Sequence, residues 1–154
     1  MKRTIWILSF VMLFVAVAAI VAADDPNIGT WNLNEGKSKI SGTAKNTKVV
    51  YEVAGDSVKV TVDGVDNDGK AAHNEWTGKF DGKDYAVTGD SASTMRSYKR
   101  INAHTLELTN KKDGKVTLTG KVVVSPDGKT RTVTITAADA SGKKATSTYV
   151  YDKE

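Results

Sequence analysis

Residues 105–138 read TLELTNKKDGKVTLTGKVVVSPDGKTRTVTITAA, and their pattern decides the fold. Apolar and polar side chains alternate within this stretch, as in residues 116–119 (VTLT) and 133–136 (VTIT). Alternation with a period of two is typical of a half-buried β-strand. Asp-Gly pairs at 113–114 and 127–128 separate the alternating segments, and Asp-Gly supplies the positive φ angles that tight hairpins need. The stretch therefore predicts three antiparallel strands joined by hairpins.

The same pattern continues through the rest of residues 24–154. This part contains 14 Val and 17 Thr but only 4 Leu, and β-branched residues suit a pleated strand better than a helix. Turn signals divide it into ten predicted strands, at 28–33, 47–54, 57–63, 71–80, 83–88, 93–101, 105–111, 115–125, 129–138 and 144–152. Only residues 34–46 leave room for a short helical turn.

Consecutive short hairpins predict an antiparallel meander. Such a sheet must hide its two edge strands, and closure into a barrel hides both. The predicted fold class is therefore all-β, an antiparallel up-and-down β-barrel of about 8–10 strands.

The first 23 residues have a different composition. They read MKRTIWILSFVMLFVAVAAIVAA, with a basic start, an apolar run and small residues at the end. This arrangement predicts a helical secretory signal peptide over 1–23, a barrel domain over 24–154, and a secreted or periplasmic location. The alternative is an uncleaved anchor, because 20 uncharged residues at ~1.5 Å each would just span a bilayer. If the leader is cleaved, no stable membrane span is expected.

Charge and composition exclude several functions. Residues 24–154 carry 20 basic and 18 acidic side chains, which gives a net charge of +2. This charge is spread along the chain, whereas nucleic-acid binding requires a clustered basic face. The absence of cysteine excludes disulfides, thiol catalysis and iron–sulfur clusters. No Gly-x-Ser-x-Gly, phosphate-loop or dinucleotide motif occurs. We therefore expect a protein that is neither an enzyme nor a cofactor carrier.

The period of two also assigns the faces of the strands. The side chains predicted to point inward are Trp31, Leu33, Tyr51, Val53, Val58, Val60, Val62, Asn74, Trp76, Phe80, Tyr85, Val87, Leu106, Leu108, Val116, Leu118, Val122, Val133, Ile135, Tyr149 and Tyr151, with Gly78 and Gly120 among them. Ten strands lined mainly by Val, Thr and Tyr favour an internal cavity for a small molecule. A flattened barrel with a filled core is the alternative.

Arginine is the most informative residue type. Residues 24–154 contain 17 Lys but three Arg. Arg131 shares the predicted inner face of its strand, whereas the pattern around Arg96, Tyr98 and Arg100 does not decide between inward and outward. Because arginine pairs with planar anions and stacks on aromatic rings, these residues, with Tyr98 or Tyr149, are candidates to hold an acidic ligand head. Structural stacking or surface pairing is the alternative role.

Metal sites have weak signals. Residues 64–75 partly match a calcium loop, but Gly64 stands at the first ligand position and strands flank the segment, which favours a hairpin. His73 and Glu75 share a strand face opposite Trp76 and are predicted to face solvent. We therefore expect no bound metal.

The start and end of the barrel domain resemble a known group of folds. Gly29-Thr30-Trp31 resembles the Gly-x-Trp opening of the calycins, which include lipocalins, fatty-acid-binding proteins and avidins, and residues 148–153 resemble the last strand of fatty-acid-binding proteins. Residues 25–39, 51–52 and 99–103 resemble exported bacterial lipocalin-like proteins. The resemblance implies a ligand-binding barrel in which Arg131 packs across Trp31. Two features differ from fatty-acid-binding proteins. Those proteins carry a two-helix lid between their first two strands, and residues 34–46 are too short to form one. Tyr149 stands where those proteins carry the arginine that grips the ligand carboxylate, which argues against a fatty-acid grip at this strand.

These observations favour an exported, monomeric binding protein that holds a small hydrophobic or amphipathic ligand. The candidate binding residues are Trp31, Tyr51, Trp76, Arg96, Tyr98, Arg100, Arg131 and Tyr149. One alternative is a protein-interaction module, since some exported barrels with a similar opening inhibit proteases by inserting their N-terminus, here residues 24–27. Another is a structural envelope protein with a filled core.

Overall fold

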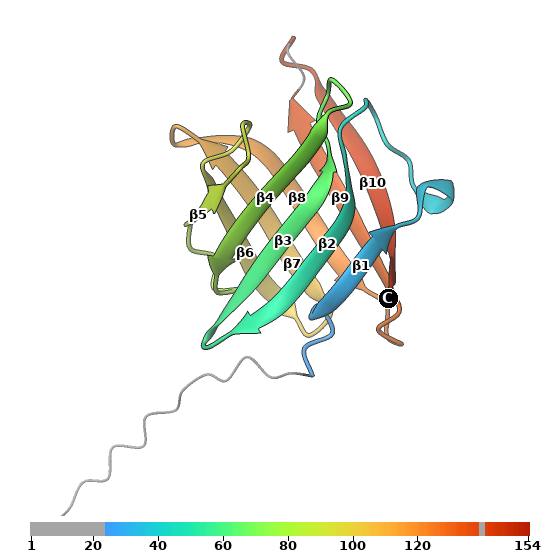
Figure 1. Ribbon diagram of the computed structural model, residues 1–154. Coiled ribbons are helices and arrows are strands. Elements are labelled where there is room, and N and C mark those ends of the chain that lie inside the picture. The colour runs from blue at the N-terminus through green and yellow to red at the C-terminus, as the bar shows by residue number, and fades with distance from the viewer. Residues whose placement is uncertain (1–23, 139–140) are drawn as a thin grey trace, which may run out of the picture.

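The protein forms a closed antiparallel barrel of ten strands, seen in a computed structural model that describes residues 24–138 and 141–154 (Figure 1). The strands are β1 (Gly29–Leu33), β2 (Lys45–Ala54), β3 (Ser57–Val65), β4 (Ala71–Gly78), β5 (Tyr85–Thr88), β6 (Met95–Asn102), β7 (Thr105–Lys112), β8 (Lys115–Val124), β9 (Thr130–Ala138) and β10 (Lys144–Lys153). The predicted fold class is confirmed, while the predicted signal peptide lies outside the described residues.

Each strand pairs with its neighbours in sequence, and β1 closes the barrel by pairing with β10. Trp31 lies opposite Lys153 on β10 and opposite Val49 on β2. Closure gives both sheet edges a hydrogen-bonding partner, which is the physical reason that a meander of short hairpins closes.

The connections define two ends of the barrel. We call the end formed by residues 24–28 and by the β2–β3, β4–β5, β6–β7 and β8–β9 turns the base, and the opposite end the mouth. Residues 34–44 connect β1 to β2 at the mouth and contain a single-turn 3₁₀ helix, Glu35–Lys37, which confirms the predicted short helical turn. The segment follows β10, because Lys39 forms a β-bridge with Thr148.

The predicted and observed strands differ most at the β4–β5 connection. The prediction carried the first strand to residue 80 and began the next at 83, whereas β4 ends at Gly78 and β5 begins at Tyr85. The reason is a local turn. The Asp81 carboxylate accepts hydrogen bonds from the Lys83 backbone N–H at 3.0 Å and from the Tyr85 hydroxyl at 2.9 Å, which stabilises the turn. The turn keeps contact with the sheet through one isolated β-bridge, between Asp81 and Lys99 on β6.

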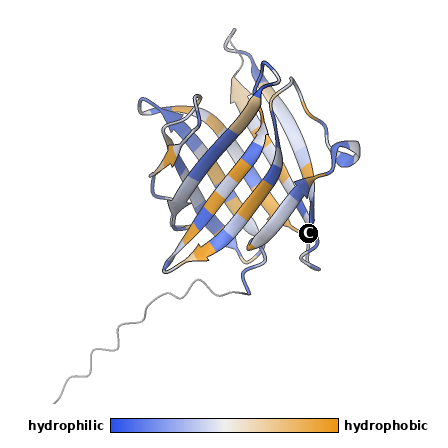
Figure 2. Ribbon diagram, viewed as in Figure 1, coloured by the Kyte–Doolittle hydropathy of each residue, from blue (hydrophilic) through white to orange (hydrophobic). Residues whose placement is uncertain are grey.

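Alternating hydropathy along the strands places most of the predicted set inside the barrel (Figure 2). The fully or nearly fully buried members are Trp31, Tyr51, Val58, Val60, Val62, Trp76, Val87, Leu106, Leu108, Val122, Val133 and Tyr151. The side chains of Tyr98 and Arg96 on β6 also point inward, and they are 4% and 6% exposed. The direction that the sequence left open on β6 is therefore inward.

Two residues of the predicted inward set are exposed. Val53 lies at the rim of the base, one pair before the end of β2, and is 42% exposed. Val116 is 56% exposed because the register between β7 and β8 shifts after Asn110. The shift sets Val116 opposite Lys111, whose position faces outward, and a β-bulge of this kind moves side chains to the other face.

An aromatic cluster fills the interior toward the base. Trp76 packs edge-on against Tyr98 with ring centroids 4.9 Å apart and against Tyr85 at 5.8 Å, and it stacks on Phe80 at 6.5 Å. Gly78 makes this possible, because a Cβ there would lie 2.6 Å from both the Trp76 and Tyr85 rings. The absent side chain of Gly78 therefore leaves the space that the Trp76 and Tyr85 rings occupy.

Candidate functional site

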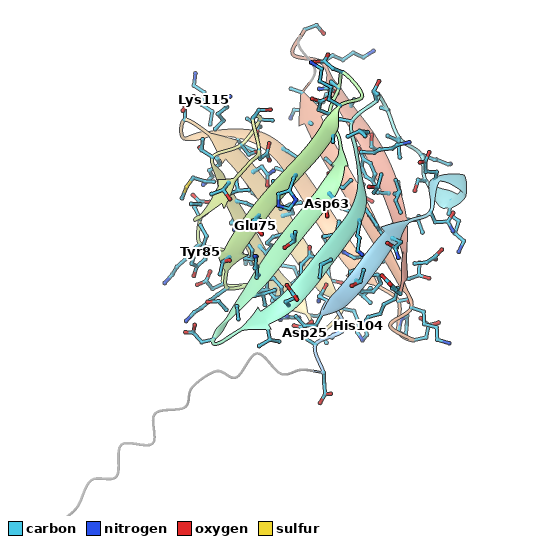
Figure 3. All side chains as sticks on the ribbon, in the orientation of Figure 1. Asp25, Asp63, Glu75, Tyr85, His104 and Lys115 are labelled. Atoms are coloured by element: carbon cyan, nitrogen blue, oxygen red, sulfur yellow. The ribbon has the colours of Figure 1, made fainter. Side chains whose placement is uncertain are left out.

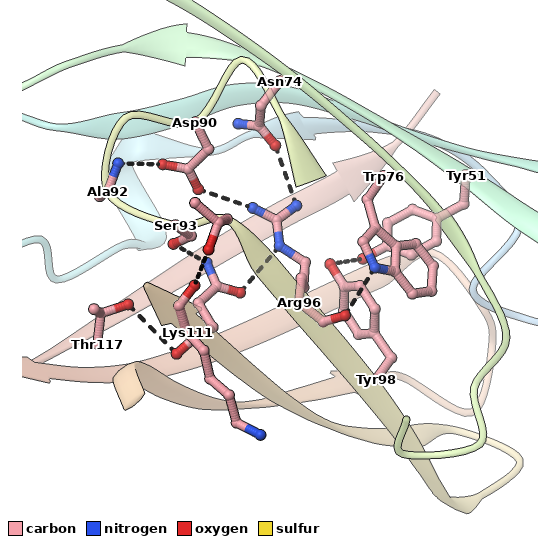
Figure 4. A network of polar contacts seen from close by, with 12 residues as sticks. Tyr51, Asn74, Trp76, Asp90, Ala92, Ser93, Arg96, Tyr98, Lys111 and Thr117 are labelled. Carbon is pink, nitrogen blue, oxygen red and sulfur yellow. Dashed lines mark hydrogen bonds and ion pairs between the residues drawn. The ribbon is translucent and has the colours of Figure 1, made fainter. Parts of the chain in front are cut away.

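Arg96 lies inside the barrel near the mouth and is fully engaged by protein groups (Figure 4). Its Nε donates to Asn110 Oδ1 at 3.0 Å, Nη1 to Asn74 Oδ1 at 3.1 Å, and Nη2 to Asp90 Oδ2 at 3.3 Å. Ser93 Oγ accepts from Asn110 Nδ2, so the β5–β6 loop is tied to the same network. Because each guanidinium nitrogen has a protein partner, Arg96 anchors the loop.

Arg100 lies at the base and pairs with the N-terminal arm. Its Nη2 forms an ion pair with Asp25, and its guanidinium lies 5.0 Å from the centre of the Phe80 ring. Asn27 is completely buried, and its carbonyl accepts a hydrogen bond from Trp31 Nε1 at 2.9 Å. Residues 25–28 are therefore packed against the base of the barrel.

Arg131 projects from β9 into the interior between two tyrosines. It is 3% exposed, and its guanidinium lies 4.5 Å from the ring centre of Tyr51 and 5.6 Å from that of Tyr151. The expected packing of Arg131 across Trp31 is wrong. Lys153 Nζ occupies that place, 5.1 Å from the indole centre, because β10 rather than β9 lies beside β1.

The hydrogen bonding of Arg131 is incomplete. Its Nη2 donates to the Tyr51 hydroxyl at 2.5 Å, and Tyr51 donates in turn to the Tyr98 hydroxyl at 3.3 Å. Within residues 24–138 and 141–154, Nε and Nη1 of Arg131 are buried and have no hydrogen-bond partner. A buried donor without an acceptor costs free energy. Asn27 Oδ1 and His104 Nδ1 are also buried without a partner, but Arg131 is the charged side chain among the described residues with this property.

Exposure increases from the base toward the mouth on one side of the interior. Along β9 the inward positions run from Arg131 and Val133, which are buried, to Ile135 and Ala137, which are half-buried. On β8, Val122 is buried and Leu118, opposite Ala137, is half-buried. These side chains have the inward parity, so part of the apolar inner wall toward the mouth is accessible to solvent.

The predicted candidates therefore fall into separate groups. Tyr51, Tyr98 and Arg131 form one hydrogen-bonded row, and Trp76 joins its edge. Tyr149 lies one inward position from Tyr151 toward the mouth and is half-buried. The remaining three candidates, Trp31, Arg96 and Arg100, serve the base and the loops, as described above.

Sequence reasoning did not assign a site role to Tyr151 or Asn110. Tyr151 was recognised only as an inward residue, although it covers the second face of the Arg131 guanidinium. Asn110 follows Leu106 and Leu108 at the same parity, so alternation alone would have revealed a polar side chain facing inward. Asp90, which pairs with Arg96 in the same network, is in a loop, where no periodic signal exists.

Acidic and histidine side chains on the outer face form ordinary pairs (Figure 3). His73 Nδ1 lies 2.6 Å from Asp63, and Glu75 pairs with Lys59 at 2.8 Å. Asp66 accepts hydrogen bonds from two backbone N–H groups of its own hairpin, in place of a calcium ligand role. In the part of the chain that the structure describes, no group of three His, Asp or Glu side chains is arranged to hold a metal.

An open depression of about 610 Å³ lies on the outer face over β6 to β9. Its lining includes Ile101, Glu107, Thr109, Lys121 and Thr136, which belong to the outward parity of their strands. Leu108 and Gly120, which have the inward parity, also line it.

Comparison with known proteins adds no relative. No protein-family model matches the chain, and no curated protein matches it. Among the described residues, none of the helices has the length and apolar character needed to cross a membrane. The arguments for function therefore rest on the barrel and its interior.

Proposed function

We propose that this protein is an exported, lipocalin-like binding protein that holds a small hydrophobic or amphipathic molecule inside the barrel. The apolar leader supports export, and the Gly-x-Trp element on β1, at the start of a closed barrel, supports the lipocalin-like character. Monomeric action is part of the same proposal, because closure leaves no sheet edge for a second copy to extend.

The observation that carries this proposal is the gradient of exposure inside the barrel. The interior is packed with aromatic rings toward the base, whereas the inward side chains Leu118, Ile135 and Tyr149 remain half-buried toward the mouth. Apolar lining that stays accessible inside a concave wall is the usual property of a small-molecule site. A ligand entering through the mouth would cover these side chains and remove their apolar surface from water.

The experiment uses an uncharged fluorescent probe, N-phenylnaphthylamine, and a pair of variants on β9. Ala137→Phe adds a ring at an inward position near the mouth, and Ala138→Phe adds the same ring at the outward position next to it. We expect the wild type and Ala138→Phe to bind the probe and Ala137→Phe to bind it at least tenfold more weakly. The proposal fails if the wild type does not bind the probe and native mass spectrometry finds no small molecule on the purified protein.

A further inference from the structure

Arg131 differs from the other two arginines in having no acidic partner. Arg96 pairs with Asp90 and Arg100 with Asp25. In the described residues, no carboxylate lies within ion-pair distance, 4.0 Å, of Arg131, although this side chain is 3% exposed. A buried guanidinium without a counter-charge is unfavourable, because burial removes the water that would otherwise stabilise it.

The tyrosines beside Arg131 do not supply the missing negative charge. Burial raises the pKa of Tyr51 well above its ordinary value, and the opposing effect of Arg131 is smaller. Burial also raises the pKa of Tyr151, again against the smaller effect of Arg131. Both hydroxyls therefore stay neutral at physiological pH, and the positive charge of Arg131 remains uncompensated.

The spare groups around Arg131 are donors. Its Nε and Nη1 have no acceptor, as described above. Tyr51 uses its proton on Tyr98, and no described group accepts the hydroxyl proton of Tyr98 in turn. A site that offers only N–H and O–H groups around one positive charge is complementary to an acceptor-only anion. A carboxylate fits it best, because its two oxygens can receive two parallel guanidinium bonds.

The wall of the barrel leads from this charge to the mouth. Val133, Ile135 and Ala137 follow Arg131 on the inner face of β9, with exposure that rises in that order from buried to half-buried. Tyr149 lies opposite Val133 on β10 and continues the same wall. Ser147 is the polar member of this wall, opposite Ile135, and its hydroxyl accepts a hydrogen bond from the Ser41 N–H. The other side chains named beyond the charged end are mainly apolar, so the wall matches a molecule with one polar end and an apolar chain.

We propose that Arg131 binds the carboxylate of a monoanionic amphipathic ligand whose apolar chain lies along β8, β9 and β10 toward the mouth. This inference rests on the proposed function and adds the chemical class of the ligand and the residue that selects it.

The test compares dansyl-labelled undecanoic acid with its methyl ester, which has the same chain and no charge. Protein purified after expression of the full chain is titrated with each probe, and dansyl fluorescence gives the dissociation constants. The variants are Arg131→Met, which keeps the length and removes the charge, and Lys121→Met, which removes an exposed charge from the outer face of the neighbouring strand.

The wild type and Lys121→Met should bind the acid at least tenfold more tightly than the ester, and Arg131→Met should bind the two equally. Equal binding of acid and ester by the wild type overturns the assignment of Arg131 while leaving the proposed function intact, and this comparison needs no variant. Retention of the acid preference by Arg131→Met also overturns it. The proposed function itself is refuted if the wild type binds neither of these probes nor the uncharged N-phenylnaphthylamine and native mass spectrometry finds no small molecule on the purified protein.

Discussion

Replacing Gly78 by alanine tests how tightly the aromatic cluster is packed. An added Cβ would lie 2.6 Å from Trp76 Cζ2 and 2.6 Å from two atoms of the Tyr85 ring, whereas ordinary contacts begin near 3.4 Å. Both rings must therefore move by about 0.8 Å in an interior packed like an organic crystal. Overpacking of this kind costs roughly 1–3 kcal/mol.

A smaller effect opposes this cost. Alanine loses less backbone entropy than glycine on folding, which favours the variant by roughly 0.5–1 kcal/mol, and Gly78 has no positive φ that would forbid a side chain. We therefore expect Gly78→Ala to lower the free energy of unfolding by about 1–2 kcal/mol. For a domain of this size, each kcal/mol corresponds to a fall in Tm of roughly 3–6 °C.

The assay is denaturant unfolding followed by tryptophan fluorescence, in which the midpoint should fall at an unchanged slope. Gly36→Ala is the matched control, because its added Cβ meets only Asn34 Oδ1 at 3.6 Å and should leave the midpoint nearly unchanged. The double variant with Tyr85→Ala should lose less stability than the two single variants together, since one obstructing ring is gone. A Gly78→Ala protein as stable as the wild type would refute the packing argument.

Three further predictions concern charge. Arg96→Met should lower the free energy of unfolding by about 3–5 kcal/mol in denaturant titrations, because it leaves the largely buried Asp90 carboxylate without its counter-charge and two amide oxygens without the donor they share. A hydrogen bond from Asn34 lowers the pKa of Asp152 from its ordinary 3.8. The ionised carboxylate therefore stabilises the fold above pH 3.8, and this stability should be lost as the pH falls through the lowered pKa. Midpoints measured from about pH 6 to pH 2 should show this loss, and Asp152→Asn should reduce it. Because burial raises the pKa values of Tyr51 and Tyr151, stability should fall as the pH rises above about 10, and tyrosinate absorbance from both rings should appear only with unfolding.

The sequence by itself determined the closed barrel, its strands and the faces of most of them, and it left the face of β6 open. Alternation along residues 105–138 and the Asp-Gly turns depend only on neighbouring residues, so local pattern is sufficient to place each hairpin. The wrong assignment of Val116 has a cause that lies outside the pattern of a single strand. Val116 was assigned to the wrong face because a bulge between β7 and β8 depends on the pairing of two strands, and one strand's pattern does not contain it.

Only the tertiary structure decided which arginine lacks a partner. Arg131 lies 80 positions from Tyr51 in the sequence, and closure of the barrel brings them into contact. The sequence showed three scarce arginines and offered Trp31 as a stacking partner for Arg131, but the β1–β10 pairing gives that place to Lys153. Periodicity determines which side of a strand a residue faces. The charge and hydrogen-bond partners that it meets there are set by the strands across the barrel, because only closure brings those strands together.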